Sequence, residues 1–330
     1  MKMKFEPVRL ITWLTAVLLV ITIATQLPLS SLLSTLRTLS VQQWLIWLSI
    51  NLINILLLVA RWRVLVYSLG LKVGFTSLLL VRQAGQLISF VTPGPQFGGE
   101  PIQIYWLWKN YRLPGHSALL VVGLDRFFEL WINFAVLLLA VIILLLTTAT
   151  DRSTWQFVAI VLTVIILALS AIGWFLVSHP DYMSKLLQRI ASRWQQHPIL
   201  GKLDSQWSEL SNMLTQLTTQ HKPALLLALV LSLFAWAGML GEIWLMLTFF
   251  DPKPSFTGFI ALFVAIRLAF LMPLPGGVGT LEAAVYWACK GLQLSSTVAL
   301  GLIVLMRIRD VLFLTGGFFA LRYLNLGKQP

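Results

Sequence analysis

The segment FLMPLPGGVGTLE at residues 270–282 interrupts a long apolar region with two prolines, three glycines and one carboxylate. Proline removes a backbone hydrogen-bond donor and clashes with the preceding helical turn, and glycine has no side chain to shield the peptide groups. A membrane helix therefore cannot pass through this segment unbroken. Such a break is tolerated at membrane depth only where protein or a water-filled cavity surrounds it. The break is assigned to Pro273, Pro275, Gly276, Gly277 and Gly279.

An earlier segment, FVTPGPQFGGE at 90–100, repeats this order of prolines, then glycines, then a glutamate seven residues after a proline. Its break residues are Pro93, Gly94, Pro95, Gly98 and Gly99. Two breaks of the same design predict that the chain consists of two related halves.

The composition indicates an all-α polytopic integral membrane protein. Of the 330 residues, 58% are hydrophobic and only 11% are charged, far outside the range of soluble globular proteins. The net charge of +12 would suggest a nucleic-acid partner in a soluble protein. Lys and Arg here fall mostly in short loops between apolar runs, so the positive-inside rule explains them and no nucleic-acid partner is expected. The single cysteine, Cys289, is interpreted as a packing residue, and no metal site is expected.

About 20 apolar residues are needed to cross a hydrocarbon layer of about 30 Å. Six runs reach this length: 10–29, 41–60, 117–148, 153–177, 223–250 and 296–321. The first follows a basic start without a small-residue cleavage site, so it is interpreted as a retained span. Two further apolar regions, 75–115 and 256–292, contain the breaks.

The distribution of basic residues favours re-entrant hairpins for both broken regions. If both regions crossed fully, basic residues would be almost evenly divided between the two faces. If both are hairpins that enter and leave on one face, the cytoplasmic face receives Lys2, Lys4, Arg9, Arg61, Arg63, Lys72, Lys109, Arg112, Lys185, Arg189, Arg193, Lys202, Lys222, Arg322 and Lys328. The external face then receives only Arg37, Arg152, Lys253 and Lys290. The second arrangement obeys the positive-inside rule, and its hairpins enter from opposite faces, as in an inverted repeat.

The predicted organisation is a single membrane domain over 1–330, with about six full spans and two opposed hairpins. A first span (1–40) precedes repeat half one (41–148, hairpin 75–115). A linking span and a cytoplasmic amphipathic connector (149–222) lead to repeat half two (223–322, hairpin 256–292). Arg126 and Glu129 follow Glu100 by 26 and 29 residues, and Arg307 and Asp310 follow Glu282 by 25 and 28. Chance similarity between Gly/Pro-rich membrane segments is the alternative to this duplication.

Charged residues within the membrane are the candidate site. Each costs about 2.5–3.5 kcal/mol on insertion scales, so these side chains should face each other or water. Arg126 with Glu129, and Arg307 with Asp310, are three residues apart and can form ion pairs on one helix face. The candidate lipid-phosphate residues are Arg82, Arg126, Arg267, Arg307 and Arg309, and the acidic pathway residues are Glu100, Asp125, Glu129, Glu242, Glu282 and Asp310. The alternative role for these charges is to hold helices together.

The residue types favour an anionic, phosphorylated ligand. Arginine presents a planar fork of donors that matches phosphate, and the N-terminal ends of broken helices add N–H groups that favour anions. A phospholipid head group fits this description, and a membrane protein meets it without an aqueous access route.

Three segments, PLPGGVGTLE at 273–282, TPGPQFGGE at 92–100 and DRFFE at 125–129, resemble the flippase-like membrane domain of the lysylphosphatidylglycerol synthase family, also called multiple peptide resistance factors. The resemblance covers nearly the whole chain. It implies movement between leaflets of a lipid such as an aminoacylated phosphatidylglycerol or a glycosylated or isoprenoid lipid. Gln103 stands where a basic residue is expected in the family. We expect a stand-alone form without the synthase domain, so lipid synthesis is not implied.

Three other functions remain open from the sequence. An enzyme acting on lipid-linked phosphates is one, but LPGHS at 113–117 lacks the second histidine motif of a phosphatase, and no enzyme activity or cofactor is expected. Opposed hairpins with central acids also suit an ion-coupled transporter of a small solute. A structural partner of another membrane protein is the third. The expected partners are membrane lipids, anionic phospholipid or isoprenoid lipid, with a second copy of the chain or a synthase as further partners. The expected location is the bacterial inner membrane, with both termini cytoplasmic.

Overall fold

The computed structural model describes residues 37, 39–92, 98–147, 152–178, 204–251, 253–272 and 274–326. Within these ranges all regular secondary structure is helical. The predicted first span, residues 179–203 of the connector, and the break residues Pro93, Gly94, Pro95 and Pro273 lie outside the described residues.

Two sets of four helices follow the same order along the chain: a long helix, two short helices and a second long helix. The first set is α3 (Val41–Ser68), α4 (Phe75–Val91), α5 (Glu100–Asn110) and α6 (Gly115–Thr147). The second set is α10 (Lys222–Phe250), α11 (Phe256–Phe270), α12 (Thr280–Gly291) and α13 (Ser296–Leu326). A short 3-10 turn, η2 (Pro275–Gly277), lies between α11 and α12, and α7 (Arg152–Ser178) and α9 (Asp204–Gln220) connect the sets. Each predicted break therefore separates two short helices.

Four of the described helices are long and apolar enough to cross a membrane: α3, α6, α10 and, within α7, Ser153–Phe175. A fifth predicted run forms the 31-residue α13, whose middle carries Arg307, Arg309 and Asp310. Helix α7 leaves many large apolar side chains exposed, among them Phe157 and Trp174. Apolar surface of this extent suits contact with lipid. The protein is an integral membrane protein.

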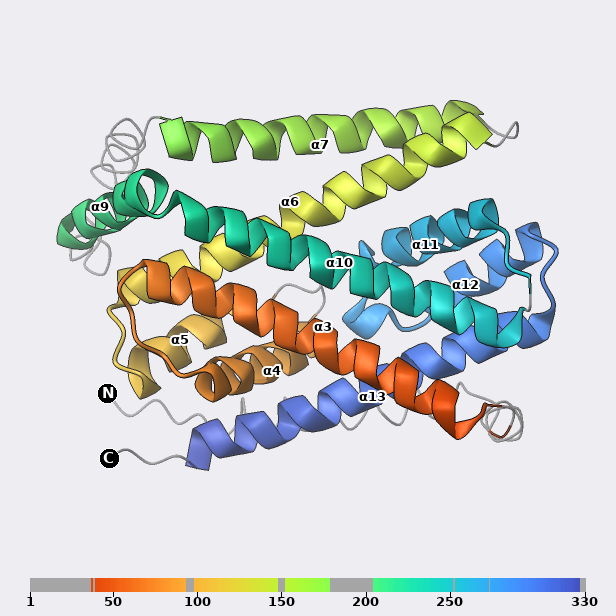
Figure 1. Cartoon of the computed structure of the whole chain (residues 1–330), viewed down its shortest axis with the longest axis horizontal. Coiled ribbons are helices and arrows are strands. Elements are labelled where there is room, and N and C mark those ends of the chain that lie inside the picture. The colour runs from red at the N-terminus through yellow and green to blue at the C-terminus, as the bar shows by residue number, and fades with distance from the viewer. Residues whose placement is uncertain are drawn as a thin grey trace.

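The two sets interlock. Helix α3 lies along α10 (Figure 1), and a side chain on Gly238 of α10 would collide with Asn54 of α3, so these two backbones approach closely. Helix α4 of the first set packs on α13 of the second, and α11 of the second set packs on α6 of the first. Each set therefore supplies part of the packing surface of the other.

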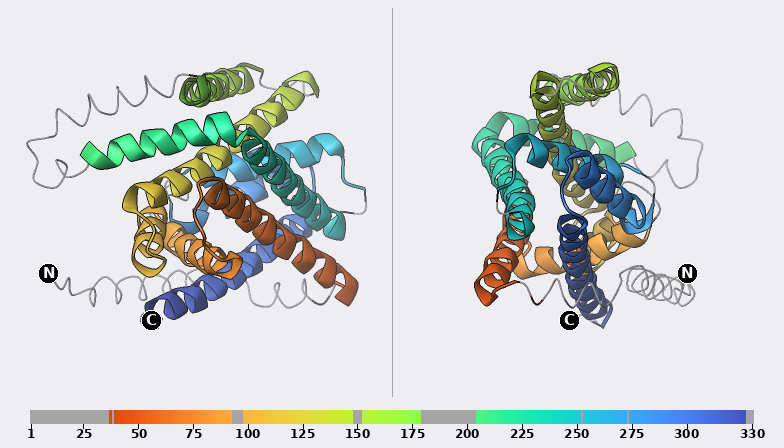
Figure 2. Two further views of the ribbon diagram at one scale, coloured as in Figure 1. Left: turned by 60° about the vertical axis from the view of Figure 1, so that its left-hand side comes forward. Right: turned by 90° about the vertical axis from the view of Figure 1, so that its right-hand side faces the viewer.

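The short helices of the two sets gather at opposite ends of the molecule. Helix α3 ends and α6 begins at the end where α4 and α5 lie, whereas α10 ends and α13 begins beside α11 and α12 (Figures 1 and 2). The two breaks meet between these ends. Gly276 has a φ of 57°, and a side chain there would collide with the ring of Phe90 in α4. Only glycine fits this position without strain.

Arg61, assigned from the sequence to a cytoplasmic loop, is instead fully buried, with 0% of its surface exposed. Helix α3 does not end near residue 60 but continues to Ser68. The helix can carry this charge through the core because Asp125 of α6 neutralises it, with Arg61 Nη2 2.7 Å from Asp125 Oδ1. The assignment was wrong because an arginine at the end of an apolar run resembles a loop residue when its partner is unknown.

Helix α9 is amphipathic, as the spacing of the connector predicts. It buries Leu214 and Leu217, and Leu214 packs against Leu120 of α6. Glu209 of α9 lies 3.0 Å from the ring of His116 near the start of α6. Cys289 is buried, in agreement with a packing role.

Candidate functional site

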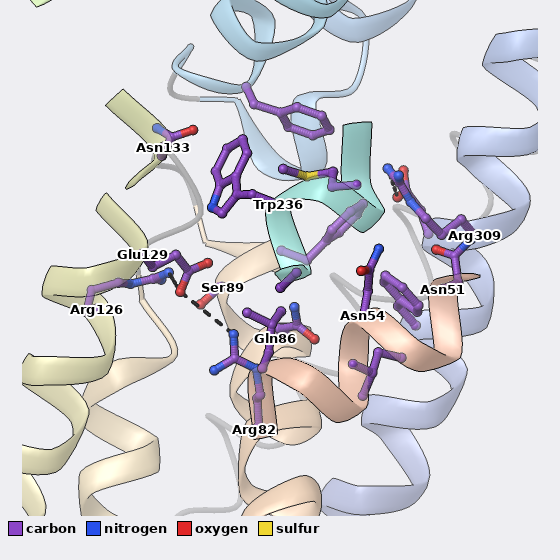
Figure 3. A pocket seen from close by; sticks show the side chains of 18 of the residues that line it. Asn51, Asn54, Arg82, Gln86, Ser89, Arg126, Glu129, Asn133, Trp236 and Arg309 are labelled. Atoms are coloured by element: carbon purple, nitrogen blue, oxygen red, sulfur yellow. Dashed lines mark ion pairs between the residues drawn. The ribbon is translucent and has the colours of Figure 1, made fainter. Parts of the chain in front are cut away.

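A pocket of about 470 Å³ lies between the two sets of helices. Helices of both sets line it, and Figure 3 shows side chains of this lining. Its charged residues are Arg82, Arg126, Arg267, Arg309, Glu100, Asp125, Glu129, Glu242 and Asp310. The structure thus brings together residues that are distant in the sequence. The other two predicted charges, Arg307 and Glu282, do not line the pocket but pair with each other next to it.

Arg126 of α6 anchors the first break. Its Nε donates to Glu100 Oε1 at 2.5 Å, and its Nη1 lies 3.1 Å from Glu129 Oε2. The second oxygen of Glu100 accepts a hydrogen bond from the Gly98 N–H at 2.8 Å. Because Glu100 is the first residue of α5, its carboxylate also lies where the N–H groups of a helix start favour negative charge. One arginine therefore ties the start of α5 to α6.

Arg307 of α13 anchors the second break with the same set of contacts. Its Nε donates to Glu282 Oε1 at 2.6 Å, and its Nη1 donates to Asp310 Oδ2 at 2.8 Å. The second oxygen of Glu282 accepts a hydrogen bond from the Gly279 N–H at 2.9 Å. The predicted ion pairs Arg126–Glu129 and Arg307–Asp310 are both confirmed.

Arg307 also satisfies backbone groups that the break leaves without helical partners. Its Nη1 donates to the carbonyl of Gly276 at 3.1 Å, and its Nη2 donates to the carbonyl of Gly277 at 3.2 Å. Unpaired carbonyls at membrane depth cost several kcal/mol each, so these bonds stabilise the break. Only 1% of the Arg307 side chain is exposed.

Asp125 of α6 holds two further arginines. Arg61 Nε donates to its Oδ1 at 2.8 Å, and Arg82 Nη1 donates to its Oδ2 at 2.8 Å. Both guanidinium groups also lie within 3.9 Å of Glu129, and Figure 3 marks the pair formed by Arg82. Arg61 Nη1 reaches Ser232 of α10 at 3.2 Å. Asp125 thereby joins α3, α4 and α6.

Glu242 of α10 makes contacts in the second set that resemble those of Arg61 of α3 in the first set, but Glu242 is negatively charged and Arg61 is positively charged. It accepts a hydrogen bond from Arg309 Nη1 of α13 at 3.0 Å and one from the Asn51 amide of α3 at 3.1 Å. Arg61 likewise contacts Asp125 on α6, the last helix of its own set, and Ser232 on α10, the first helix of the other set. Where the first set carries an arginine, the second carries a glutamate.

Arg267 of α11 is the exception among the core arginines, because no carboxylate of the described residues lies within 4.0 Å of it. Its Nη2 donates to the Asn133 side-chain oxygen, and its guanidinium carbon lies 4.9 Å from the ring centre of Trp236 and 6.0 Å from that of Phe270. Its Nε is buried and has no hydrogen-bond partner among the described residues. A cation at the pocket wall is therefore held by an amide and two aromatic rings.

Several pocket residues were not predicted from the sequence. They are Arg61, which supports the wall, and the polar or aromatic lining residues Asn51, Asn54, Gln86, Ser89, Asn133 and Trp236. Asn51, Asn54 and Asn133 are amides within apolar runs, and an amide at such a position is a signal that could have revealed them. Gln103, noted as a departure from the family, also lines the pocket and lies against Gly85.

Comparisons with known proteins agree with the membrane architecture. A UPF0104 membrane protein of Methanocaldococcus jannaschii is 22% identical over 258 residues, which are 76% of this chain and 75% of that protein. No solved structure matches the chain. The family described as the lysylphosphatidylglycerol synthase TM region matches residues 9–316. This match spans nearly the full sequence, both breaks and every charged residue of the pocket, and the chain therefore belongs to that family.

Proposed function

We propose that the protein moves a lipid head group carrying a phosphate-class anion between the two leaflets, through the pocket between its two helix sets. The family supports a lipid-related membrane function. The observation that carries the proposal is Arg267, a pocket cation without a carboxylate partner among the described residues. A buried cation without a carboxylate in contact is a favourable place for an anion, and an anionic ligand would supply the close partner that Arg267 lacks.

The form of the pocket favours an amphipathic ligand over a purely polar one. Arginine offers a planar fork of donors that matches phosphate oxygens. Beside these donors the pocket has apolar walls, formed among others by Phe90, Phe134, Met239 and Phe270. A lipid, with a polar head and an apolar body, fits both kinds of surface.

We assign different tasks to the arginines. Arg82, Arg126, Arg267 and Arg309 line the pocket and form the pathway for the head group, together with the acidic residues of the lining. Arg307 and Glu282 hold the second break, since four donor contacts of Arg307 already go to protein acceptors. The activity is transport and not catalysis, and its partners are membrane lipids, with a second copy or a separate synthase as protein partners. The proposed location is the bacterial inner membrane, with both termini cytoplasmic.

The proposal includes two opposed re-entrant hairpins, α4–α5 and α11–α12, in an inverted repeat. The duplicated contacts of Arg126 and Arg307 support this arrangement. So does a second likeness, because Tyr-Trp is followed by Lys in both α5 (Tyr105, Lys109) and α12 (Tyr286, Lys290). Each lysine lies over an aromatic ring of its own helix, Lys109 5.2 Å from the Tyr105 centre and Lys290 5.0 Å from the Trp287 centre.

Labelling of single cysteines tests the hairpins. In a Cys289→Ala background, cysteines at the exposed positions Lys109 and Lys290 are expected to react from opposite faces, cytoplasmic and external respectively. An impermeant maleimide applied to intact cells and to inverted vesicles measures this. If both regions crossed the membrane fully, both positions would be external. External labelling of Lys109→Cys would therefore refute the re-entrant arrangement.

Lipid flux in reconstituted vesicles tests the role of Arg267. Hydrogen bonds to charged groups contribute about 1.5–3 kcal/mol, so Arg267→Gln is expected to lower the flux of fluorescent phosphatidylglycerol about 10- to 100-fold. Its thermal stability should stay close to that of the wild type, because no carboxylate of the described residues lies within 4.0 Å of Arg267 and no close ion pair is lost. Arg267→Lys should give an intermediate flux, since lysine keeps the charge but loses the fork.

The matched control is Arg63→Gln. Arg63 is an exposed arginine of α3 whose guanidinium lies over Tyr67 at 5.1 Å, away from the pocket lining. This variant should transport at the wild-type rate. Normal flux in a folded Arg267→Gln variant would contradict the proposed function. Uptake of glycerol phosphate without lipid flux would favour a small-solute transporter instead.

A further inference from the structure

The charges of the core network balance in total but not locally. Six arginines (Arg61, Arg82, Arg126, Arg267, Arg307 and Arg309) accompany six carboxylates (Glu100, Asp125, Glu129, Glu242, Glu282 and Asp310). Around the first break, three arginines contact three carboxylates. Around the second, only Arg307 and Arg309 contact three carboxylates, Glu242, Glu282 and Asp310. In these contacts the carboxylates outnumber the arginines by one, while Arg267, the third arginine of the second set, contacts no carboxylate of the described residues.

Comparison of the two sets explains this imbalance. Arg82 and Arg267 both stand in the short helix before a break, and Arg82 pairs with Asp125, the residue before Arg126. The residue before Arg307 is Met306, which carries no charge. Arg267 thus has no counterpart of Asp125, and the balancing negative charge lies instead on Glu242 of α10, where the first set has Arg61 on α3.

An anion that binds Arg267 makes the network negative as a whole. A net charge in a buried, low-dielectric site is strongly unfavourable, so the anion must arrive with a positive charge. The three carboxylates that share only Arg307 and Arg309 are the groups that such a charge would meet. A proton is the smallest cation that a buried carboxylate can take up.

Glu242 is the carboxylate with the weakest compensation. Asp310 contacts two arginines, at 2.8 and 3.6 Å, and Glu282 contacts Arg307 and a backbone N–H. Among the described residues, Glu242 contacts Arg309, which it shares with Asp310, and the Asn51 amide, and 2% of Glu242 is exposed. On the helices packed against α10, the charged groups that line the same pocket are Asp125, Arg126, Glu129, Arg267, Arg309 and Asp310, and the amides are Asn51, Asn54 and Asn133. Asn51 suits either state of Glu242, because its amide can donate to a carboxylate or accept from a carboxyl group.

We propose that Glu242 takes up one proton for each anionic head group that binds at Arg267, so that transport of the lipid is coupled to protons. This inference rests on the proposed function and adds its energy source. A lipid whose head group carries its own cation needs no such proton. Anionic and zwitterionic lipids should therefore differ in their dependence on pH.

Proton uptake can be measured directly by calorimetry on the purified full chain. Binding of short-chain phosphatidylglycerol is titrated in buffers of different ionisation enthalpy, and the slope of the observed enthalpy gives the protons taken up per ligand. The wild type is expected to take up about one proton per lipid in the pH range where the free protein is deprotonated and the complex is protonated, and in that range its affinity falls about tenfold per pH unit. Glu242→Gln should bind the same lipid with no proton uptake and with little change of affinity with pH. Glu209→Gln, a change at a largely exposed carboxylate of α9, is the control and should behave as the wild type.

The outcomes separate the inference from the proposed function. Binding and flux of phosphatidylglycerol without proton uptake would overturn the coupling and leave the lipid function intact. Proton uptake that persists in Glu242→Gln would exclude Glu242 as its site. Short-chain phosphatidylethanolamine should bind without proton uptake, and uptake with both lipids would contradict the charge argument. Glycerol phosphate carries a phosphate without the apolar body of a lipid, so its binding, compared with that of the lipids, distinguishes a lipid site from a site for free phosphate. If neither lipid binds, both proposals are overturned.

Discussion

Replacement of Arg307 by methionine is expected to lower the free energy of unfolding by about 3–5 kcal/mol, the range found when one partner of a buried ion pair is removed. Methionine has a similar length but no donors. It would leave Glu282 and Asp310 without the guanidinium that lies 2.6 and 2.8 Å from them. It would also leave the carbonyls of Gly276 and Gly277 without their donor. Thermal and denaturant unfolding in detergent micelles measure the loss.

Double variants show whether the charge or the backbone contacts dominate this loss. Arg307→Met with Asp310→Leu removes the arginine and one of its two carboxylate partners. Arg307→Met with Glu282→Gln removes the arginine and the other partner. If charge dominates, each double variant should recover part of the stability lost by Arg307→Met. If the carbonyl contacts dominate, neither should recover it. A single variant as stable as the wild type would show that Arg307 does not hold the break.

The second large effect is expected for Asp125→Asn. Arg61 and Arg82 both depend on this carboxylate, and their side chains are only 0% and 6% exposed. Asparagine has the same shape, but its amide nitrogen would turn a donor toward one of two arginines that offer only donors. Two buried cations would then share Glu129 at 3.8–3.9 Å as their remaining carboxylate partner among the described residues. We expect a loss of about 3–5 kcal/mol in the free energy of unfolding.

Glu129→Gln is the matched comparison on the same helix. Glu129 contacts Arg61 and Arg82 at longer distances than Asp125 does, and its side chain is 30% exposed. Water can therefore replace part of its interaction, and the loss of stability should be clearly smaller. Equal losses for the two variants would mean that the two carboxylates are interchangeable and that Asp125 does not organise the core.

The order of the helices could be predicted because it depends on local properties of the chain. Proline and glycine at 273–279 break a helix through backbone sterics alone, and the length of an apolar run determines whether it can cross a membrane. The pairs Arg126–Glu129 and Arg307–Asp310 follow from the spacing of residues on one helix. These expectations need no knowledge of what lies across the core.

The partners of the other charges could not be predicted, because they depend on which helices meet. Arg82 and Arg267 each stand in the short helix before a break and look alike in the sequence. Yet Arg82 meets Asp125, whereas Arg267 meets Asn133 and Trp236. Arg61 could not be assigned correctly for the same reason. It looks like a loop residue in the sequence, and the position of Asp125 on α6 is what shows that it is buried.

The contact between the two breaks has a mechanical consequence. The ring of Phe90 occupies the space in which a side chain at Gly276 would stand, so the end of α4 and the turn η2 rest directly on one another. Neither can slide without pushing the other. Helices α4 and α11 lead to this contact from opposite ends of the molecule (Figure 1). We expect a displacement of α4 to be transmitted through this contact to η2, and a displacement of η2 to α4.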